Sequence, residues 1–157
     1  METLTSTTID KSKWPRGPWD LEVDKKQWTD AATGLPCLIV RHSRCGHWCG
    51  YVGVPEGHPL FGKTKEDDAL DGLRAHGGIT FTDLCQPLDK NGHGICHVPG
   101  PGEPDRAWWI GFDCGHAWDL SPAYQAGVVD DADYRDQAYV EAECAILAAQ
   151  LQAKERR

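Results

Sequence analysis

Residues Arg106–Leu120 read RAWWIGFDCGHAWDL, and expectations for the whole chain can be organised around this stretch. Its first half is a short aromatic and apolar run bounded by glycine and proline, which predicts a buried β-strand over residues 107–113. Its second half carries titratable side chains at Asp113, Cys114, His116 and Asp119. Polar groups at the point where a core strand leaves the core commonly form a functional site. The stretch therefore predicts a strand that ends in a site.

Three more segments are expected to pair with this strand in a mostly antiparallel sheet. Residues 35–42 and 45–54 read LPCLIVRH and CGHWCGYVGV, and both are rich in β-branched or apolar side chains. The short connection between them favours a hairpin. In the second segment Trp48 and Val52 would share one face, because side chains alternate along a strand. Residues 79–82 follow a His-Gly-Gly corner and predict a further short strand.

The C-terminal segment predicts a long helix from about Asp131 to Lys154. Apolar side chains recur on one face with 4-3-4 spacing at Val140, Cys144, Leu147 and Leu151. We expect this face to pack on the sheet, and a dimer helix, which would make a homo-oligomer, is the alternative. The predicted fold class is α+β. A single domain over residues 20–157 would follow a flexible N-terminal arm over residues 1–19.

Two segments around the sheet show weaker patterns. Residues 64–74, TKEDDALDGLR, predict a short exposed helix capped by Thr64. Residues 84–105 are rich in Gly, Pro and His and predict a long loop. Loops beyond ~12–15 residues are uncommon unless they are functional or disordered, so a lid and a variable insertion are both open interpretations.

Composition excludes several classes of protein. The chain has 157 residues, 40% of them hydrophobic, which suits one domain with a real core. Its net charge of −8 argues against binding a nucleic-acid duplex, which needs a basic face. No apolar run approaches the ~18–20 residues that cross a bilayer, and the N-terminus has no apolar signal core. We therefore expect a cytoplasmic protein without a membrane partner.

The segment His76-Gly77-Gly78 is the first candidate for a functional site. Glycines after a histidine let the backbone turn sharply and let an anion approach the amide groups closely. His76 would then contact a ligand or move a proton as a catalytic residue, with Gly77 and Gly78 binding the ligand. A tight turn beside a surface histidine is the alternative interpretation.

A second group comprises Asp113, His116 and Asp119, spaced three residues apart. On one helical turn these side chains would lean to one side and could hold a divalent metal through nitrogen and oxygen ligands. His116 could also act as a catalytic proton shuttle. The alternative is a solvated loop in which the carboxylates cap turns. Strand pairing is expected to bring His76 close to Asp113 and His116.

Other residues could complete a binding pocket for an anion. His58 and Lys63 lie in the loop GHPLFGK, where they could contact a ligand, although an exposed turn is the favoured interpretation. Trp108 and Trp109 would face opposite sides of their strand. One of the two should therefore belong to the core, and the other could stack on a flat ligand such as a nucleobase.

The cysteines permit further interpretations. Cys45, His47 and Cys49 form a C-x-H-x-C spacing and would share a face in a strand. Structural zinc usually needs C-x2–4-C pairs, so buried, reduced cysteines are favoured over zinc at these three positions. Seven cysteines cannot all pair within one chain, and Cys114, beside His116, is a candidate nucleophile.

The blocks WCGYVGVPEGHPLFGK, HGGITF and WWIGFDCGHAWDL resemble a family of small bacteriophage and prophage proteins. The resemblance covers roughly residues 35–120 and implies a phage accessory protein in the host cytoplasm, where such proteins often counter host defences. It implies no catalytic residue. With the residue patterns, it predicts a His/Asp pocket that binds a small anionic, nucleotide-like ligand and hydrolyses it with a divalent metal. The alternatives are a non-catalytic sponge for a signalling nucleotide and an inhibitor of a host enzyme.

Overall fold

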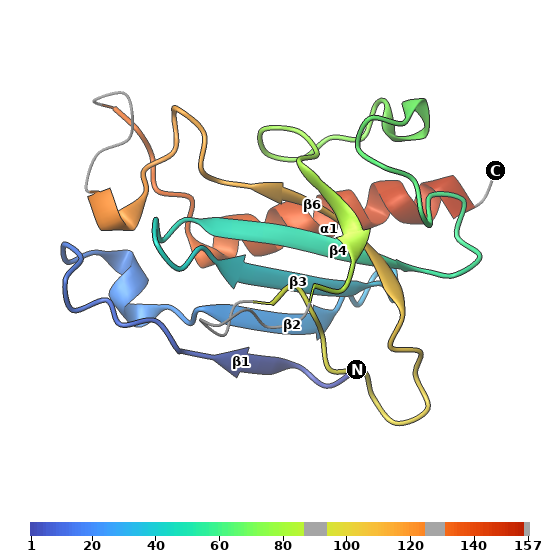
Figure 1. Ribbon diagram of the computed structural model, residues 1–157, viewed down its shortest axis with the longest axis horizontal. Coiled ribbons are helices and arrows are strands. Elements are labelled where there is room, and N and C mark those ends of the chain that lie inside the picture. Colours follow the sequence, from blue (N-terminus) through green and yellow to red (C-terminus); the bar gives the residue numbers. More distant parts are fainter. Residues whose placement is uncertain (87–93, 125–130, 156–157) are drawn as a thin grey trace.

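Strands β4 (Trp48–Pro55) and β6 (Ala107–Asp113) pair at the middle of the fold (Figure 1). The computed structural model describes residues 1–86, 94–124 and 131–155. All strand pairs are antiparallel, in the order β1-β2-β3-β4-β6-β5. The remaining elements are β1 (Leu4–Ser6), β2 (Lys25–Thr29), β3 (Pro36–Arg41), β5 (Phe81–Leu84) and the helix α1 (Gln137–Glu155). The predicted α+β fold, with an antiparallel sheet and a C-terminal helix packed on it, is confirmed.

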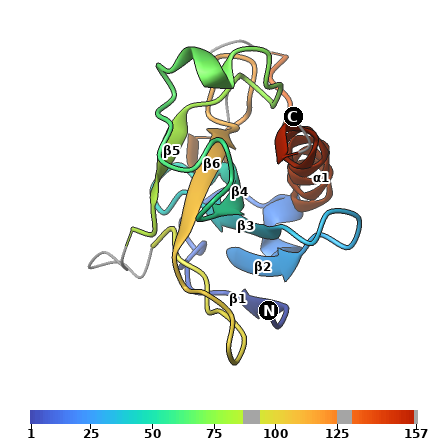
Figure 2. The same cartoon turned by 90° about the vertical axis from the view of Figure 1, so that its right-hand side faces the viewer.

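Helix α1 covers one face of the sheet, over β3 and β4 (Figure 2). Trp48 and Val52 point toward this helix, as the strand alternation predicted, and both are fully buried. Gly50 lies between them, and a Cβ atom there would come within 2.4 Å of the Phe112 ring and 3.0 Å of Cys144 Sγ. A glycine is required at this position because the helix and the β6 ring approach the strand backbone so closely.

The predicted apolar stripe of α1 is buried, but the helix begins at Gln137 rather than near Asp131. Asp133 uses its backbone to accept a hydrogen bond from Leu120 N and to donate one to Trp118 O. These bonds keep the preceding segment extended. Asp136 Oδ1 then accepts the N–H of Tyr139 and satisfies a free donor at the start of the helix.

The N-terminal arm belongs to the sheet, which corrects the prediction of a flexible segment over residues 1–19. Leu4–Ser6 pair with Lys25–Gln27 as an edge strand. Further along, Pro18–Leu21 form a 3-10 turn that buries Trp19. The domain therefore includes this arm.

Arg41, at the end of β3, joins the arm to the sheet from a fully buried position. Its Nε donates to Asp24 Oδ1 over 3.0 Å and its Nη2 to Glu22 Oε1 over 3.2 Å. Its Nη1 donates to Gly46 O, and its guanidinium lies 4.2 Å from the centre of the Trp48 ring. Burial alone would raise the pKa of Asp24, but hydrogen bonds from Lys11, Ile9 N and Thr8 N hold that pKa below its usual range.

Two other elements differ from their predictions. Residues 64–74 contain only a 3-10 turn at Asp68–Leu70, which Asp67 caps instead of Thr64. The edge strand predicted at 79–82 is β5, two residues later. Of the predicted 84–105 loop, residues 94–105 form neither helix nor strand, and 87–93 lie outside the described residues. Within the described residues, no helix is both long and apolar enough to cross a bilayer.

Candidate functional site

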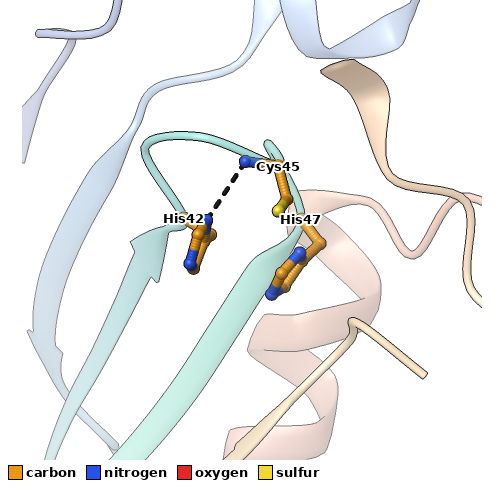
Figure 3. A group of neighbouring side chains, drawn as sticks. All are labelled: His42, Cys45 and His47. Carbon is orange, nitrogen blue, oxygen red and sulfur yellow. Dashed lines mark hydrogen bonds between the residues drawn. The ribbon is translucent and has the colours of Figure 1, made fainter. Parts of the chain in front are cut away.

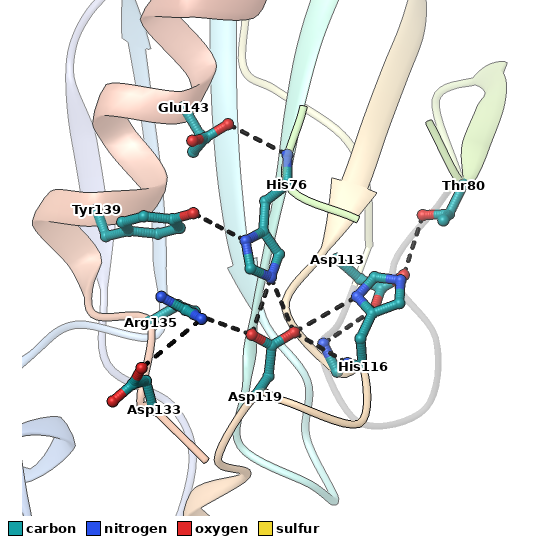
Figure 4. Close-up of polar contacts among 10 residues, drawn as sticks. His76, Thr80, Asp113, His116, Asp119, Asp133, Arg135, Tyr139 and Glu143 are labelled. Atoms are coloured by element: carbon teal, nitrogen blue, oxygen red, sulfur yellow. Dashed lines mark hydrogen bonds and ion pairs between the residues drawn. The ribbon is translucent and has the colours of Figure 1, made fainter. Parts of the chain in front are cut away.

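Three loop segments and the start of α1 meet at one end of the sheet (Figure 4). His76 lies in the loop before β5, while His116 and Asp119 lie in the turn that follows β6. His76 Nε2 is 2.9 Å from both Oδ1 and Oδ2 of Asp119. The rings of His76 and His116 lie edge to face, with centres 5.9 Å apart. The structure therefore brings together residues 40 positions apart in the sequence.

His116 completes a group of three donors. One donor atom each from His76, His116 and Asp119 lies within 4.8 Å of the other two. His116 Nδ1 is 3.4 Å from Asp119 Oδ2, yet the atom is buried and makes no hydrogen bond with the described residues. A neutral buried ring nitrogen without a partner is destabilising, so this atom is suited to coordinate a ligand.

The Asp119 carboxylate contacts both histidines of this three-donor group. Its carboxylate also accepts the Arg135 Nε–H over 3.0 Å and the backbone N–H of His116 over 3.0 Å. Burial would raise the pKa of Asp119, but the hydrogen bonds from His76, His116 N and Arg135 outweigh burial and lower that pKa. Asp119 is therefore ionised at neutral pH, with the negative charge that a cation or an imidazolium would need.

Helix α1 orients His76 from the other side. Tyr139 Oη is 2.8 Å from His76 Nδ1, and Glu143 accepts the backbone N–H of His76. A hydroxyl both donates and accepts, so Tyr139 can serve either tautomer of His76. His76 can thus keep its Nε2 proton for Asp119, or move the proton to Nδ1 and present a bare Nε2 to a metal.

Asp113 occupies a neighbouring position, not the centre of the group. Its carboxylate accepts Thr80 Oγ1–H over 3.0 Å and Gly115 N–H over 2.9 Å. His116 Nδ1 lies 3.7 Å from Asp113 Oδ1, at the outer limit of an ion pair. Asp113 lines a hollow whose wall includes His47 but not His76 or His116. Asp113 therefore flanks the three-donor group.

The other residues predicted to bind a ligand lie elsewhere. His58 is buried, with Nε2 2.9 Å from Leu151 O and Nδ1 accepting Leu60 N–H. Leu151 is twelve residues beyond Tyr139 on α1, about 18 Å along the axis at the usual helical rise. His58 is therefore a structural histidine. Lys63 is in the same loop and lies 3.9 Å from Asp67.

The two adjacent tryptophans face opposite sides, as the strand pattern predicted. Trp109 is fully buried, and its Nε1 donates to Cys85 Sγ. Trp108 packs near Phe61 and donates its Nε1–H to Lys63 O. Trp108 lies five residues before Asp113, about 17 Å along the strand. Neither tryptophan reaches the His76 group.

The turn His76-Gly77-Gly78 contributes to the site mainly through its backbone conformation. Gly78 N donates to Ala75 O, so this amide is occupied within the turn. Gly77 has φ +70°, and a Cβ atom there would lie 2.2 Å from His116 Cε1. The absence of a side chain at Gly77 therefore lets the His116 ring approach the corner.

A matched pair of alanine variants tests this packing. Gly78 has φ +89°, and a Cβ atom added there would have nothing within 4 Å, so Gly78→Ala should bring only the backbone penalty of about 1–2 kcal/mol. Gly77→Ala should add displacement of His116. We expect urea unfolding to show a larger loss of stability in Gly77→Ala than in Gly78→Ala, and imidazole NMR signals of His116 to shift only in Gly77→Ala. Equal His116 shifts in both variants would contradict this packing.

Two cysteine hypotheses change with the structure. Cys114 is buried, and burial together with the nearby Asp119 raises the pKa of its thiol far above its usual range, which opposes a nucleophilic role. Cys49 does not join Cys45 and His47, because β4 begins only at Trp48 and directs Cys49 toward the Tyr51 and Phe81 side. His42 takes its place beside Cys45 and His47.

His47 gives the chain a predicted acid sensitivity. Burial, then the neighbouring His42, lowers the pKa of His47 to about 4, against partial compensation by Asp113 and Asp119. The unfolded state takes up the proton near pH 6.5, so stability should fall as the pH drops from about 6.5 to 4, by up to about 3 kcal/mol. Urea unfolding with chelator across this range should show that slope. A His47→Gln variant should flatten it, and an equal slope in the variant would exclude His47 as the cause.

Arg135 and Tyr139 are site residues that the sequence interpretation missed. Arg135 lies two residues before α1 and Tyr139 in its first turn, and the Arg135 guanidinium lies 5.3 Å from the centre of the Tyr139 ring. An Arg-x3-Tyr spacing beside a helix start is too common to signal a site, so only the packing of this segment and α1 identifies them.

Comparisons with protein-family models, with curated proteins and with solved structures find no match to this chain.

Proposed function

We propose that His76, His116 and Asp119 bind a divalent metal ion, and that the protein uses it to hydrolyse a small anionic, nucleotide-like ligand. The observation that carries this proposal is the convergence of three donors, one of them a buried nitrogen without a hydrogen bond. Two histidines and one carboxylate form a familiar catalytic metal set, which leaves further coordination positions for water and substrate.

The spacing of the donors suits an ion. Ligand atoms about 2.0–2.1 Å from a tetrahedral zinc are about 3.3 Å apart. His76 Nε2 and His116 Nδ1 lie 2.9 Å and 3.4 Å from the oxygens of Asp119. The side chain of His116 is 37% exposed, so the group is reachable from solvent.

The surroundings favour an anionic ligand with a flat ring. Arg135 is partly exposed beside Asp119 and supplies a cationic group for a phosphate or carboxylate. Trp118, next to Asp119 in the chain, is 67% exposed and offers a stacking surface that Trp108 and Trp109 do not.

A divalent ion held by His76, His116 and Asp119 would supply an acidified water molecule at neutral pH. Asp119 holds His76 and Arg135 in place, and Arg135 neutralises charge that develops on the ligand. Tyr139 Oη would accept the Nδ1–H of His76 in the tautomer that leaves Nε2 available. Asp113, 3.7 Å from His116 and outside the donor group, is the neighbouring carboxylate that would serve as a general base.

The alternative functions are a sponge that binds a signalling nucleotide without turnover and an inhibitor of a host enzyme. The resemblance of the sequence to phage and prophage proteins adds to the proposal that the protein acts in a phage-infected host cell. The same three donors would also serve the sponge. The inhibitor would instead use the acidic surface implied by the net charge of −8.

The proposal is tested with protein stripped of metal and reloaded with Zn²⁺ or Mn²⁺. We expect hydrolysis of a nucleoside phosphate or an activated phosphodiester, with loss on chelation. His116→Ala should remove activity, whereas His97→Ala, which changes a histidine outside the group, should retain it. Ligand recovered intact after denaturation would favour the sponge. Equal metal content in wild type and His116→Ala would contradict the proposed site.

A further inference from the structure

A second group of donors lies in the turn between β3 and β4 and shares no member with the His76 group. His42, Cys45 and His47 converge there (Figure 3), and one donor atom from each lies within 4.8 Å of the other two. All three come from six consecutive residues, so the tight hairpin itself fixes their relative positions.

The hairpin turn holds both histidine rings close together. The backbone N–H groups of Arg44 and Cys45 donate to His42 Nδ1 over 3.3 Å and 3.1 Å, so a metal ion would bind His42 through Nδ1 in place of these two bonds. The rings of His42 and His47 stack with centres 4.9 Å apart. This arrangement reduces the side-chain entropy that would be lost on binding an ion.

His47 presents an unsatisfied atom to this group. Its Nδ1 is buried and receives no hydrogen bond from the described part of the chain. Gly115 packs against the other edge of the ring, where a Cβ atom would lie 2.8 Å from His47 Cε1 and Nε2. An imidazole nitrogen buried without a partner is costly unless a ligand engages it.

A hollow of about 370 Å³ adjoins the group, and its lining includes His42, His47 and Asp113. Three protein ligands beside a hollow leave a coordination position for water or a small molecule. A closed structural zinc site, in contrast, uses four protein ligands.

We propose that His42, Cys45 and His47 form a second metal site, selective for a thiophilic divalent ion such as Zn²⁺. A thiolate with two imidazoles is a soft-to-borderline donor set, which favours Zn²⁺ over Mg²⁺ and Ca²⁺. Binding forms a metal–sulfur bond and releases the Cys45 thiol proton to solvent. The ion would also link the end of β3 to the start of β4.

Cobalt distinguishes this site from the His76 group, because only this site contains sulfur. Metal-free, reduced protein is titrated with Co²⁺, and sulfur-to-cobalt charge transfer is recorded in the near ultraviolet. We expect a saturable band in the wild type that Zn²⁺ then abolishes, since Zn²⁺ binds such sites more tightly than Co²⁺. The absence of a thiolate band in cobalt-bound protein overturns the proposal.

Cys45→Ser and Cys49→Ser are the matched variants, since both replace a partly buried thiol of the same hairpin. The band should be lost in Cys45→Ser and kept in Cys49→Ser. The band should also persist in His116→Ala, so this experiment tests the second metal site independently of the proposed catalytic site. A band that survives Cys45→Ser or disappears in Cys49→Ser overturns the assignment.

Gly115→Ala provides a variant that leaves every donor in place. Its added methyl should press on His47 and weaken Co²⁺ binding by at least the ~10–100-fold seen for changes around metal ligands. Circular dichroism confirms that each variant is folded. Unchanged affinity in a folded Gly115→Ala protein counts against His47 as a ligand.

Discussion

Replacement of Arg41 by alanine should destabilise the protein by about 3–5 kcal/mol, because it leaves Glu22 without a cation and the buried Asp24 with Lys11 alone. Asp24 and Glu22 both accept hydrogen bonds from the Arg41 guanidinium, and the side chain of Asp24 is only 1% exposed. The variant also loses the contact with the Trp48 ring. Urea unfolding measured by tryptophan fluorescence gives the free energy directly.

Two variants separate the buried pair from general effects of charge. Arg44→Ala removes an exposed arginine from the neighbouring turn and should change stability by less than about 0.5 kcal/mol. Arg41→Ala combined with Glu22→Gln should recover part of the loss, since Glu22 is the carboxylate left without a cation while Asp24 keeps Lys11. If the free energy of unfolding of Arg41→Ala lies within about 1 kcal/mol of the wild-type value, the hydrogen bonds of Arg41 contribute little to stability.

The central sheet could be predicted from the sequence because its signals are local. Strands β3, β4 and β6 carry apolar or alternating patterns with turns at both ends, and their bounds lie close to the predicted ones. The edge strand β1 has no such pattern. Its three residues, Leu-Thr-Ser, are all exposed, so it is held by backbone pairing with β2 that composition does not reveal.

The start of α1 shows how tertiary contacts override a local preference. Acidic residues from Asp131 onward favour a helix N-terminus. The backbone of Asp133 nevertheless pairs with the segment Trp118–Leu120, and the helix can begin only after that bridge. The same bridge places Arg135 beside Asp119. One non-local contact therefore sets both the helix boundary and the electrostatics of the site.

The site itself could be predicted only in part. The ends of strands and the His-Gly-Gly corner pointed to His76, His116 and Asp119, and the structure places these three together. Asp113 was expected at the centre but is engaged by Thr80 and Gly115. His58 was expected at the surface, yet it ties its loop to the C-terminal part of α1. Sequence spacing does not say which polar side chains will be buried as structural contacts.

Replacement of Asp119 by asparagine should reduce the affinity of the proposed catalytic site for Zn²⁺ by about 70- to 900-fold. Structural zinc binding of about 10–16 kcal/mol over four ligands corresponds to roughly 2.5–4 kcal/mol for each. Arg135 donates to Asp119 Oδ1 and His116 N to Oδ2, so asparagine retains an acceptor for one of these two donors, and circular dichroism checks that the variant is folded. Competition with a chromophoric chelator, at neutral pH and with Cys45→Ser as background, measures this site alone.

Asp133→Asn is the matched control, because Asp133 is an exposed carboxylate 3.9 Å from the same Arg135. It should leave Zn²⁺ affinity within about twofold, since exposed ion pairs contribute little. Hydrogen bonds from His76, His116 N and Arg135 hold the pKa of Asp119 below its usual range, so its carboxylate is ionised at the neutral pH of this titration. If Asp133→Asn lowers the affinity as much as Asp119→Asn, the effect is a long-range loss of negative charge, and Asp119 does not bind the ion.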